Sequence, residues 1–244
     1  MQPFIAAALA LLAVVVSTVA RASCGAAFCL VNSAWDLPGG ADDPGARLDL
    51  RYETIRQGRP LAGGRRVSVG ELRRHHDEVS TANRNLVGAL DFSVADRWGF
   101  NVAVPVVDRS HRHIHNHGGG QIPEGWDFRA VGDTRLLGRY RLSDNAPSAS
   151  GDLTAFGLNA GLKLPTGRQD ERNREGALAE RSLQPGTGTT DLLVGGYATR
   201  FLPLADLSWF AQGLAQLPVN ARSGYRPGAR LSLDSGIRYE VDGR

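Results

Sequence analysis

The chain has 244 residues and carries 28 Lys and Arg, 25 Asp and Glu and 6 His, for a formal net charge of +3. Nearly all of the positive residues are arginine, since Lys163 is the single lysine. The arginines alternate with acidic residues instead of gathering in one patch. This distribution argues against a nucleic-acid-binding protein. The length suits one sizeable domain.

The N-terminus predicts an exported protein. Residues 5–16 are an unbroken apolar run that is too short to cross a bilayer comfortably as a helix, and Ala20-Arg21-Ala22 fits a signal peptidase site. We therefore expect residues 1–22 to be a signal peptide, although Met1-Gln2-Pro3 lacks the usual positive charge. An anchoring helix is the alternative.

Cys24 and Cys29 are the only cysteines, and they lie in the segment 23–45, which we expect to be periplasmic. In an exported protein such a pair predicts a small disulfide loop. A metal or redox pair is the less favoured alternative, because the spacing is not Cys-x-x-Cys.

Period-two alternation of apolar and polar residues recurs between turn-forming clusters from residue 46 onward. The last such segment is the cleanest, with Leu231, Leu233 and Ile237 opposing Ser232 and Asp234. The pattern predicts eight strands, at residues 47–56, 83–94, 100–106, 133–142, 156–164, 190–202, 207–217 and 231–241.

The connections between these strands alternate in length. The short ones are residues 95–98, 143–151 and 203–206. The long ones are residues 57–78, 108–130, 166–188 and 219–228. Short turns at one end, long loops at the other and strands of about ten residues are typical of outer-membrane barrels. With the export signal, they predict an all-β protein, an antiparallel transmembrane β-barrel, over a soluble sandwich.

The chain ends at Asp242-Gly243-Arg244, and Asp-Gly is a hairpin-turn signal. We therefore expect a further strand beyond it. Residues 46–244 are interpreted as the N-terminal part of a barrel with at least eight strands, located in the outer membrane of a Gram-negative bacterium.

The polar faces of the strands carry charges of both signs. In a wide barrel these side chains would line water, whereas in a narrow one they would pair and plug the lumen; the sequence leaves both open. The residues predicted to line the lumen are Arg47, Asp49, Arg51, Glu53, Asp133, Arg135, Arg139, Arg141, Asp234, Arg238 and Glu240.

All six histidines fall in two segments that we expect at the same, extracellular rim. Strand alternation continued past Val106 places the odd-numbered histidines of 111–117 on the lumen side, and continued backward from Asn83 it reaches His75 and Asp77. Imidazoles on alternate residues suit Zn, Cu or Ni, and Asp77 and Glu78 could add oxygen ligands or orient the rings. A hydrogen-bonded rim and a solvated loop are the alternatives. The candidate metal ligands are His75, His76, Asp77, His111, His113, His115 and His117.

The sequence contains no Ser-His-Asp arrangement and no His-Glu-x-x-His motif, and Asp77 and Glu78 have no context for general acid–base chemistry. We therefore expect no enzyme activity and no cofactor beyond the possible divalent metal. The expected partners are outer-membrane lipid and a small-molecule solute, with the oligomeric state open.

Several segments together resemble a group of poorly characterised outer-membrane barrels of Gram-negative bacteria. This group is commonly labelled transporter-like and is related to the phenol-degradation meta-pathway outer-membrane proteins. The resemblance implies a barrel that passes small, often hydrophobic or aromatic, compounds, and it carries over no functional residues. The alternatives are a metal-capturing surface protein and a structural barrel without transport. The resembling segments are residues 24–36, 75–79, 111–120, 132–140, 162–167 and 183–191.

Overall fold

The computed structural model describes residues 45–59, 61–62, 64–69, 71, 76–95, 97–117, 120–143, 153–202 and 207–239. The predicted signal peptide, the Cys24/Cys29 pair, His75 and Glu240 lie outside these residues, as do the side chains of His76, His117 and Arg238. Among the described residues, no helix is long and apolar enough to cross a membrane.

The described chain is built from β-strands. The eight predicted strands are all present, as β1, β4, β5 and β7 to β11. The bounds are β1 Gly45–Gln57, β2 Leu61–Ala62, β3 Arg65–Arg66, β4 His76–Ala95, β5 Trp98–His117, β6 Gly120–Val131, β7 Thr134–Arg141, β8 Leu153–Leu164, β9 Asp191–Leu202, β10 Leu207–Pro218 and β11 Arg230–Tyr239. Strand alternation in the sequence therefore located these eight strands, although β4 and β5 are longer than predicted and β6 was missed.

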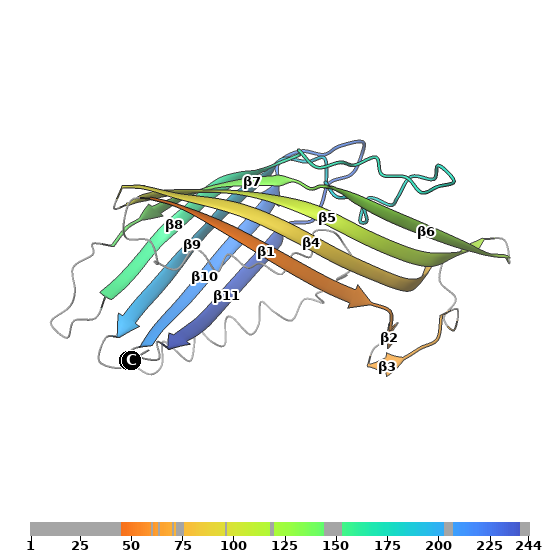
Figure 1. Cartoon of the computed structure of the whole chain (residues 1–244), viewed down its shortest axis with the longest axis horizontal. Helices are drawn as coiled ribbons and strands as arrows, with labels where there is room; N and C mark the ends of the chain where they lie inside the picture. The colour runs from red at the N-terminus through yellow and green to blue at the C-terminus, as the bar shows by residue number, and fades with distance from the viewer. Residues whose placement is uncertain are drawn as a thin grey trace.

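The main sheet is antiparallel, with strands in the order β1-β4-β5-β7-β8-β9-β10-β11, and it curls into an open half-barrel (Figure 1). Each strand pairs with the next one along this path, as expected for an up-and-down barrel. The β2–β3 hairpin lies apart from this sheet, in the long connection between β1 and β4.

Strand β5 is long enough to pair with two strands. Its first part, Trp98–Ala103, pairs with β7, and its second part, Val106–His117, pairs with β6. The N–H of Gly132 donates to the carbonyl of Pro105 (2.8 Å) where β6 gives way to β7. Strands β4, β5 and β6 thus form a three-strand extension past the end of β7.

The prediction that residues 108–130 form a long loop was wrong, because most of them belong to β5 and β6. Pro123 and Gly125 interrupt the apolar alternation within β6 and disguise it as a loop. Its pairing with β5 nevertheless runs without a register shift from Val106↔Val131 to His117↔Gly120.

The two faces of the sheet have opposite character. Outward-facing side chains are apolar and exposed, as for Leu50 (67%), Leu158 (54%) and Ile237 (75%), whereas Asn159 and Lys163 on the concave face are 2–3% exposed. A soluble protein buries apolar side chains and exposes polar ones, so this sheet has the reverse arrangement.

Candidate functional site

Residues 165–190, which connect β8 to β9 and are called the inward loop below, pack against the concave face of the three-strand extension. The indole of Trp126 on β6 is 2% exposed and packs against Ala179 and Leu183 of this loop. Its Nε1–H donates to the carbonyl of Ala177 (3.0 Å). The loop is therefore attached to the inside wall by a small apolar cluster.

Arg109 on β5 forms a second attachment. Its Nη1 donates to the carbonyls of Leu183 (2.9 Å) and Ser182 (3.2 Å), and its Nε donates to Oδ1 of Asn83 on β4 (2.6 Å). The side chain is 1% exposed. A buried arginine held by one strand and bonding loop carbonyls fixes the loop in position as well as in orientation.

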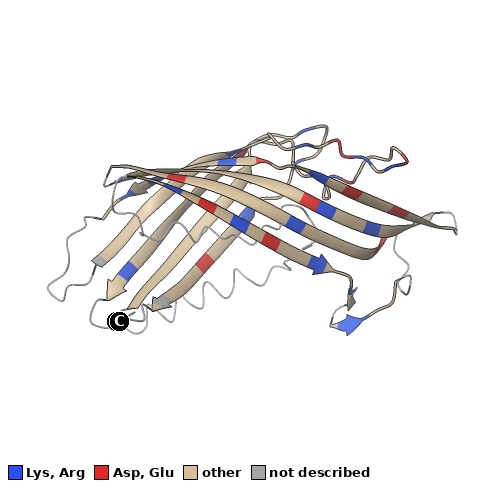
Figure 2. Ribbon diagram, viewed as in Figure 1, with Lys and Arg blue, Asp and Glu red and all other residues tan. Residues whose placement is uncertain are grey.

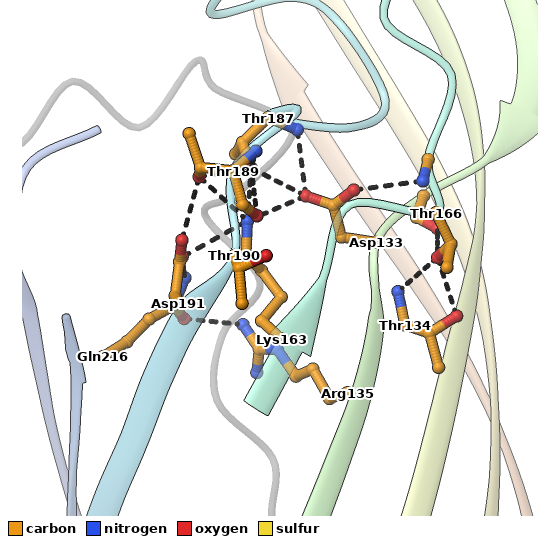
Figure 3. A network of polar contacts seen from close by, with 12 residues as sticks. Asp133, Thr134, Arg135, Lys163, Thr166, Thr187, Thr189, Thr190, Asp191 and Gln216 are labelled. Atoms are coloured by element: carbon orange, nitrogen blue, oxygen red, sulfur yellow. Dashed lines mark hydrogen bonds and ion pairs between the residues drawn. The ribbon is translucent and has the colours of Figure 1, made fainter. Parts of the chain in front are cut away.

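The third attachment is a buried polar network around the only lysine (Figure 3). The Nζ of Lys163 on β8 lies 2.9 Å from Oδ2 of Asp133 and 3.2 Å from Oδ2 of Asp191, and it also bonds the hydroxyl of Thr187. Lys163, Asp133 and Asp191 are all less than 9% exposed. The two carboxylates outnumber the one ammonium, and Arg135 lies nearby with a second positive charge.

Asp133 holds both ends of the inward loop. Its Oδ1 accepts from the N–H of Gly167 (3.0 Å), near the start of the loop, and its Oδ2 accepts from the N–H (2.9 Å) and hydroxyl (2.8 Å) of Thr187, near the end. Asp191 accepts from the hydroxyl of Thr189 (2.8 Å). The buried carboxylate of Asp133 therefore holds the two ends of the inward loop together.

The two ends of the loop touch backbone to backbone. A Cβ added at Gly186 would lie 2.6 Å from the carbonyl oxygen of Gly167, and one added at Gly167 would lie 2.7 Å from Cα of Gly186 and from the carbonyl carbon of Gly132. Since the obstructing atoms are backbone, only glycine fits these close approaches.

Two histidines of β5 join a hydrogen-bonded chain on the same concave face, formed by Glu78, Thr81, His111, His113 and Glu124 and called the His relay below. The hydroxyl of Thr81 donates to Oε1 of Glu78 (2.5 Å) and bonds Nδ1 of His111 (2.7 Å). Nε2 of His111 lies 3.1 Å from Nδ1 of His113, whose Nε2 lies 2.9 Å from Oε2 of Glu124.

The His relay requires four protons for its four hydrogen bonds, because ionised carboxylates only accept. Neutral Thr81, His111 and His113 supply one proton each, so the relay shares one additional proton among its members.

The surroundings of His111 disfavour placing the additional proton on His111. Burial, reinforced by the positive charges of His113, Arg109 and Arg112, lowers the pKa of His111 to about 4. Desolvation and like charges both disfavour an imidazolium. The rings of His111 and His113 also lie beside Trp126, with centroids 6.1 and 5.1 Å from the indole. The His relay therefore shares its main apolar neighbour with the inward loop.

The structure brings the two histidine segments side by side, since His76 pairs with His115 and Glu78 with His113. A β-bulge between Glu78 and Ser80 reverses the alternation of β4. Glu78 is thereby opposite His113, while Asp77 is opposite Ile114 and accepts from Nδ2 of Asn116 (2.8 Å). The backward extrapolation of strand alternation past residue 79 did not anticipate this bulge.

The metal-site interpretation stays a prediction. No three His, Cys, Asp or Glu side chains within the described part of the chain are grouped to hold a metal ion. Two imidazole nitrogens 3.1 Å apart in His111 and His113 are fewer ligands than the three or four protein groups usual for zinc. The side chains of His75, His76 and His117 lie outside the described residues.

The charged residues predicted to line the lumen share the concave face with the buried polar residues. Their ion pairs follow the wall: Arg51 Nε lies 2.9 Å from Glu53 Oε1 on the same strand, and Arg47 Nη2 lies 3.7 Å from Asp91 Oδ2 on the adjacent strand. Figure 2 shows both signs mixed along β1 and β4. These pairs run between neighbours, not across the opening.

Sequence reasoning missed the residues that hold the inward loop, namely Arg109, Trp126, Lys163, Thr187, Thr189 and Asp191. One signal was available, because Lys163 is the single lysine and falls on the polar face of its predicted strand. A lone lysine on an inward face requires an acidic partner. The identity of that partner depends on a contact between β8 and the residue preceding β7, which alternation does not reveal.

No protein-family profile matches this chain, and no curated protein matches it. The arrangement of residues in the structure therefore carries the functional argument.

Proposed function

We propose that this protein is an outer-membrane β-barrel channel for small solutes, narrowed by the inward loop. The observation that carries this proposal is the reversed sheet, with exposed apolar residues on the outer face and polar and charged residues on the concave face. Lipid on the outside and water on the inside is the environment in which such a sheet is stable.

The outer apolar band has dimensions that support this proposal. On β5 it runs from Trp98 to Val106, which is about 26 Å along the strand at about 3.3 Å per residue and about 20 Å in height at the usual strand tilt. Membrane barrels carry an apolar band about 25 Å tall. Trp98 lies beside Tyr140, with ring centroids 4.7 Å apart, at the short-turn end. Aromatic pairs of this kind are typical of a membrane interface.

The inward loop supports a channel of restricted width. It lies on the inner wall, attached by Trp126, Arg109 and Asp133. A loop folded against the wall reduces the cross-section without closing it. The passage beside the loop and the mixed charges of β1 and β7 would then select solutes by their size and charge.

The resemblance to barrels related to the phenol-degradation meta-pathway group suggests small hydrophobic or aromatic compounds as the cargo. The polar concave wall favours compounds that also tolerate water. Metal capture is the alternative favoured by the adjacent His111 and His113 rings, and it needs ligands from outside the described residues.

Efflux from proteoliposomes tests the proposal. The full chain, reconstituted into phospholipid vesicles, should release small entrapped solutes such as benzoate faster than a large dextran. Vesicles that contain correctly inserted protein but retain all solutes equally would reject the channel and leave a structural or metal-binding barrel. Zinc added to the outside of the vesicles should change efflux only if the metal-capture alternative, with His111 and His113 as ligands, is correct.

A further inference from the structure

The outer face changes abruptly from apolar to charged across one row of paired residues. Leu86, Val106 and Val131 are aligned on β4, β5 and β6. The next outward-facing row along the same strands is Arg84, Asp108 and Arg129. Because outward positions recur every second residue, the apolar band ends between these two rows.

Arginine is concentrated just beyond this boundary. Arg56 on β1 pairs with Ala82, in the outward-facing row next to that of Arg84. Arg112 on β5 is opposite Ser80, in the row after that. All four arginines are exposed. Among the described residues, the acidic residues in these rows are Asp108 and Asp127, so positive charge is in excess there.

The acidic residues are distributed unequally among these arginines. Arg112 Nη2 lies 2.5 Å from Asp127 Oδ2, and this hydrogen bond holds the pKa of Asp127 below its usual range. Arg112 also lies flat over Gly125, where an added Cβ would be 2.7 Å from its Cδ. Arg112 and Asp127 therefore neutralise each other in a fixed geometry.

The remaining group is Arg56, Arg84, Arg129 and a single carboxylate. Arg84 Nη1 lies 3.3 Å from Asp108 Oδ1. Neither Arg56 nor Arg129 makes an ion pair with any residue that the structure describes. Arg84 and Arg129 are two strands apart, which is about 10 Å at the usual strand spacing. Three guanidinium groups over one carboxylate leave two positive charges available for a ligand.

We propose that Arg56, Arg84 and Arg129 form a binding site for the phosphate groups of a membrane lipid in the leaflet at the long-loop end of the barrel. This inference rests on the proposed membrane placement, because it identifies the lipid that covers this part of the apolar band. Arginine matches phosphate bidentately. The site lies where the apolar band ends, so acyl chains would pack on Leu86 and Val131 while the phosphate contacts Arg84 and Arg129.

Native mass spectrometry of the full chain in detergent tests the site, with bisphosphorylated lipid A as the probe and phosphatidylcholine as the neutral lipid. Lipid A should bind in preference to phosphatidylcholine. The variant R56Q/R129Q should bind it about 25-fold more weakly, since each interfacial arginine contributes about a factor of five. The matched variant R66Q/R174Q, with the same charge change on connecting segments, should bind like the wild type.

A second variant, expected to bind lipid A more tightly, distinguishes loss of the site from loss of folding. D108N removes the competing carboxylate and should bind lipid A more tightly than the wild type. Equal binding by the wild type and R56Q/R129Q, or displacement of lipid A by excess inorganic phosphate, would overturn the site as a lipid-phosphate site. Solute efflux without lipid preference would reject this inference alone, whereas failure to insert into vesicles would reject the proposed function as well.

Discussion

Lys163 and Asp133 are 30 residues apart in the sequence, yet the lysine Nζ lies 2.9 Å from the aspartate Oδ2. This ion pair is buried in the concave wall, and the same aspartate binds Gly167 and Thr187 at the two ends of the inward loop. The strand wall and the loop inside it are therefore fixed by one charge pair.

Replacing Lys163 with methionine should release the inward loop. The change leaves Asp133 and Asp191 buried beside each other with Arg135 as the one cation nearby, and breaking a buried pair in this way costs about 3–5 kcal/mol. We expect trypsin to cut K163M within residues 165–190 much faster than the wild type, with the sheet intact by circular dichroism. R174M, which changes an exposed arginine of the same loop, should show only the loss of its own cleavage position.

The variant K163M/D133N/D191N separates charge from shape. It removes both carboxylate charges along with the ammonium, so it should recover part of the protease resistance that K163M loses. If the triple variant is no more resistant than K163M, burial of unpaired charge is not what destabilises the loop.

Substituting Gly186 with alanine tests the close backbone approach. The new Cβ would lie 2.6 Å from the Gly167 carbonyl oxygen, so the two ends of the loop must separate. Overpacking of this kind costs about 1–3 kcal/mol. Hydrogen exchange should show loss of protection at the Gly167 and Thr187 amides. G228A, where the added Cβ has no atom within 4 Å, is the control and should keep full protection.

Acidification should weaken the His relay between pH 6.5 and pH 4. The pKa of His111 in the folded protein is lowered to about 4 from 6.5, so over this window the unfolded chain takes up a proton that the native chain does not. Stability therefore falls as the pH falls, by about 2–3 kcal/mol across this window. Histidine NMR should show one imidazole titrating near pH 4, and H111Q should abolish that signal. An imidazole at position 111 that titrates near 6.5 would contradict the lowered pKa of His111.

The outer band is tested by placing a charge on it. Leu158 on β8 faces outward and is 54% exposed. An arginine at a lipid-facing midplane position of a barrel costs about 2–4 kcal/mol. We expect L158R to fold into lipid vesicles with a lower yield and a lower urea midpoint than the wild type. L178R changes an exposed leucine of the inward loop and should have no such effect. If L158R inserts and unfolds like the wild type, the outer face is not in lipid.

The strands were predictable from the sequence because their cause is local. Alternation at period two records which side of the sheet each residue faces, as with Leu231 and Leu233 against Ser232 and Asp234. It is visible in the strands that have one apolar face and one polar face. Strand β6 was missed because Pro123 and Gly125 interrupt the pattern, while its inner residues Trp126 and Phe128 contact a loop instead of water.

The site was less predictable because its contacts are not local. Thr187 meets Asp133 across 54 residues, and Arg109 meets Leu183 across 74. The inward direction of the loop depends on these contacts, and no residue within 165–190 specifies it alone. The bulge between Glu78 and Ser80 is a further case, since one extra residue decides whether Asp77 or Glu78 faces the histidines.

Ion conductance across a planar bilayer tests the central claim most directly, with the wild-type chain compared with G186A and G228A. The proposed channel should give discrete conductance steps in the wild type and G228A. The steps should be larger in G186A, because release of the inward loop widens the passage. Inserted protein that passes no current in any of the three forms, or equal conductance in the wild type and a G186A form shown to have a released loop, would contradict a channel narrowed by this loop.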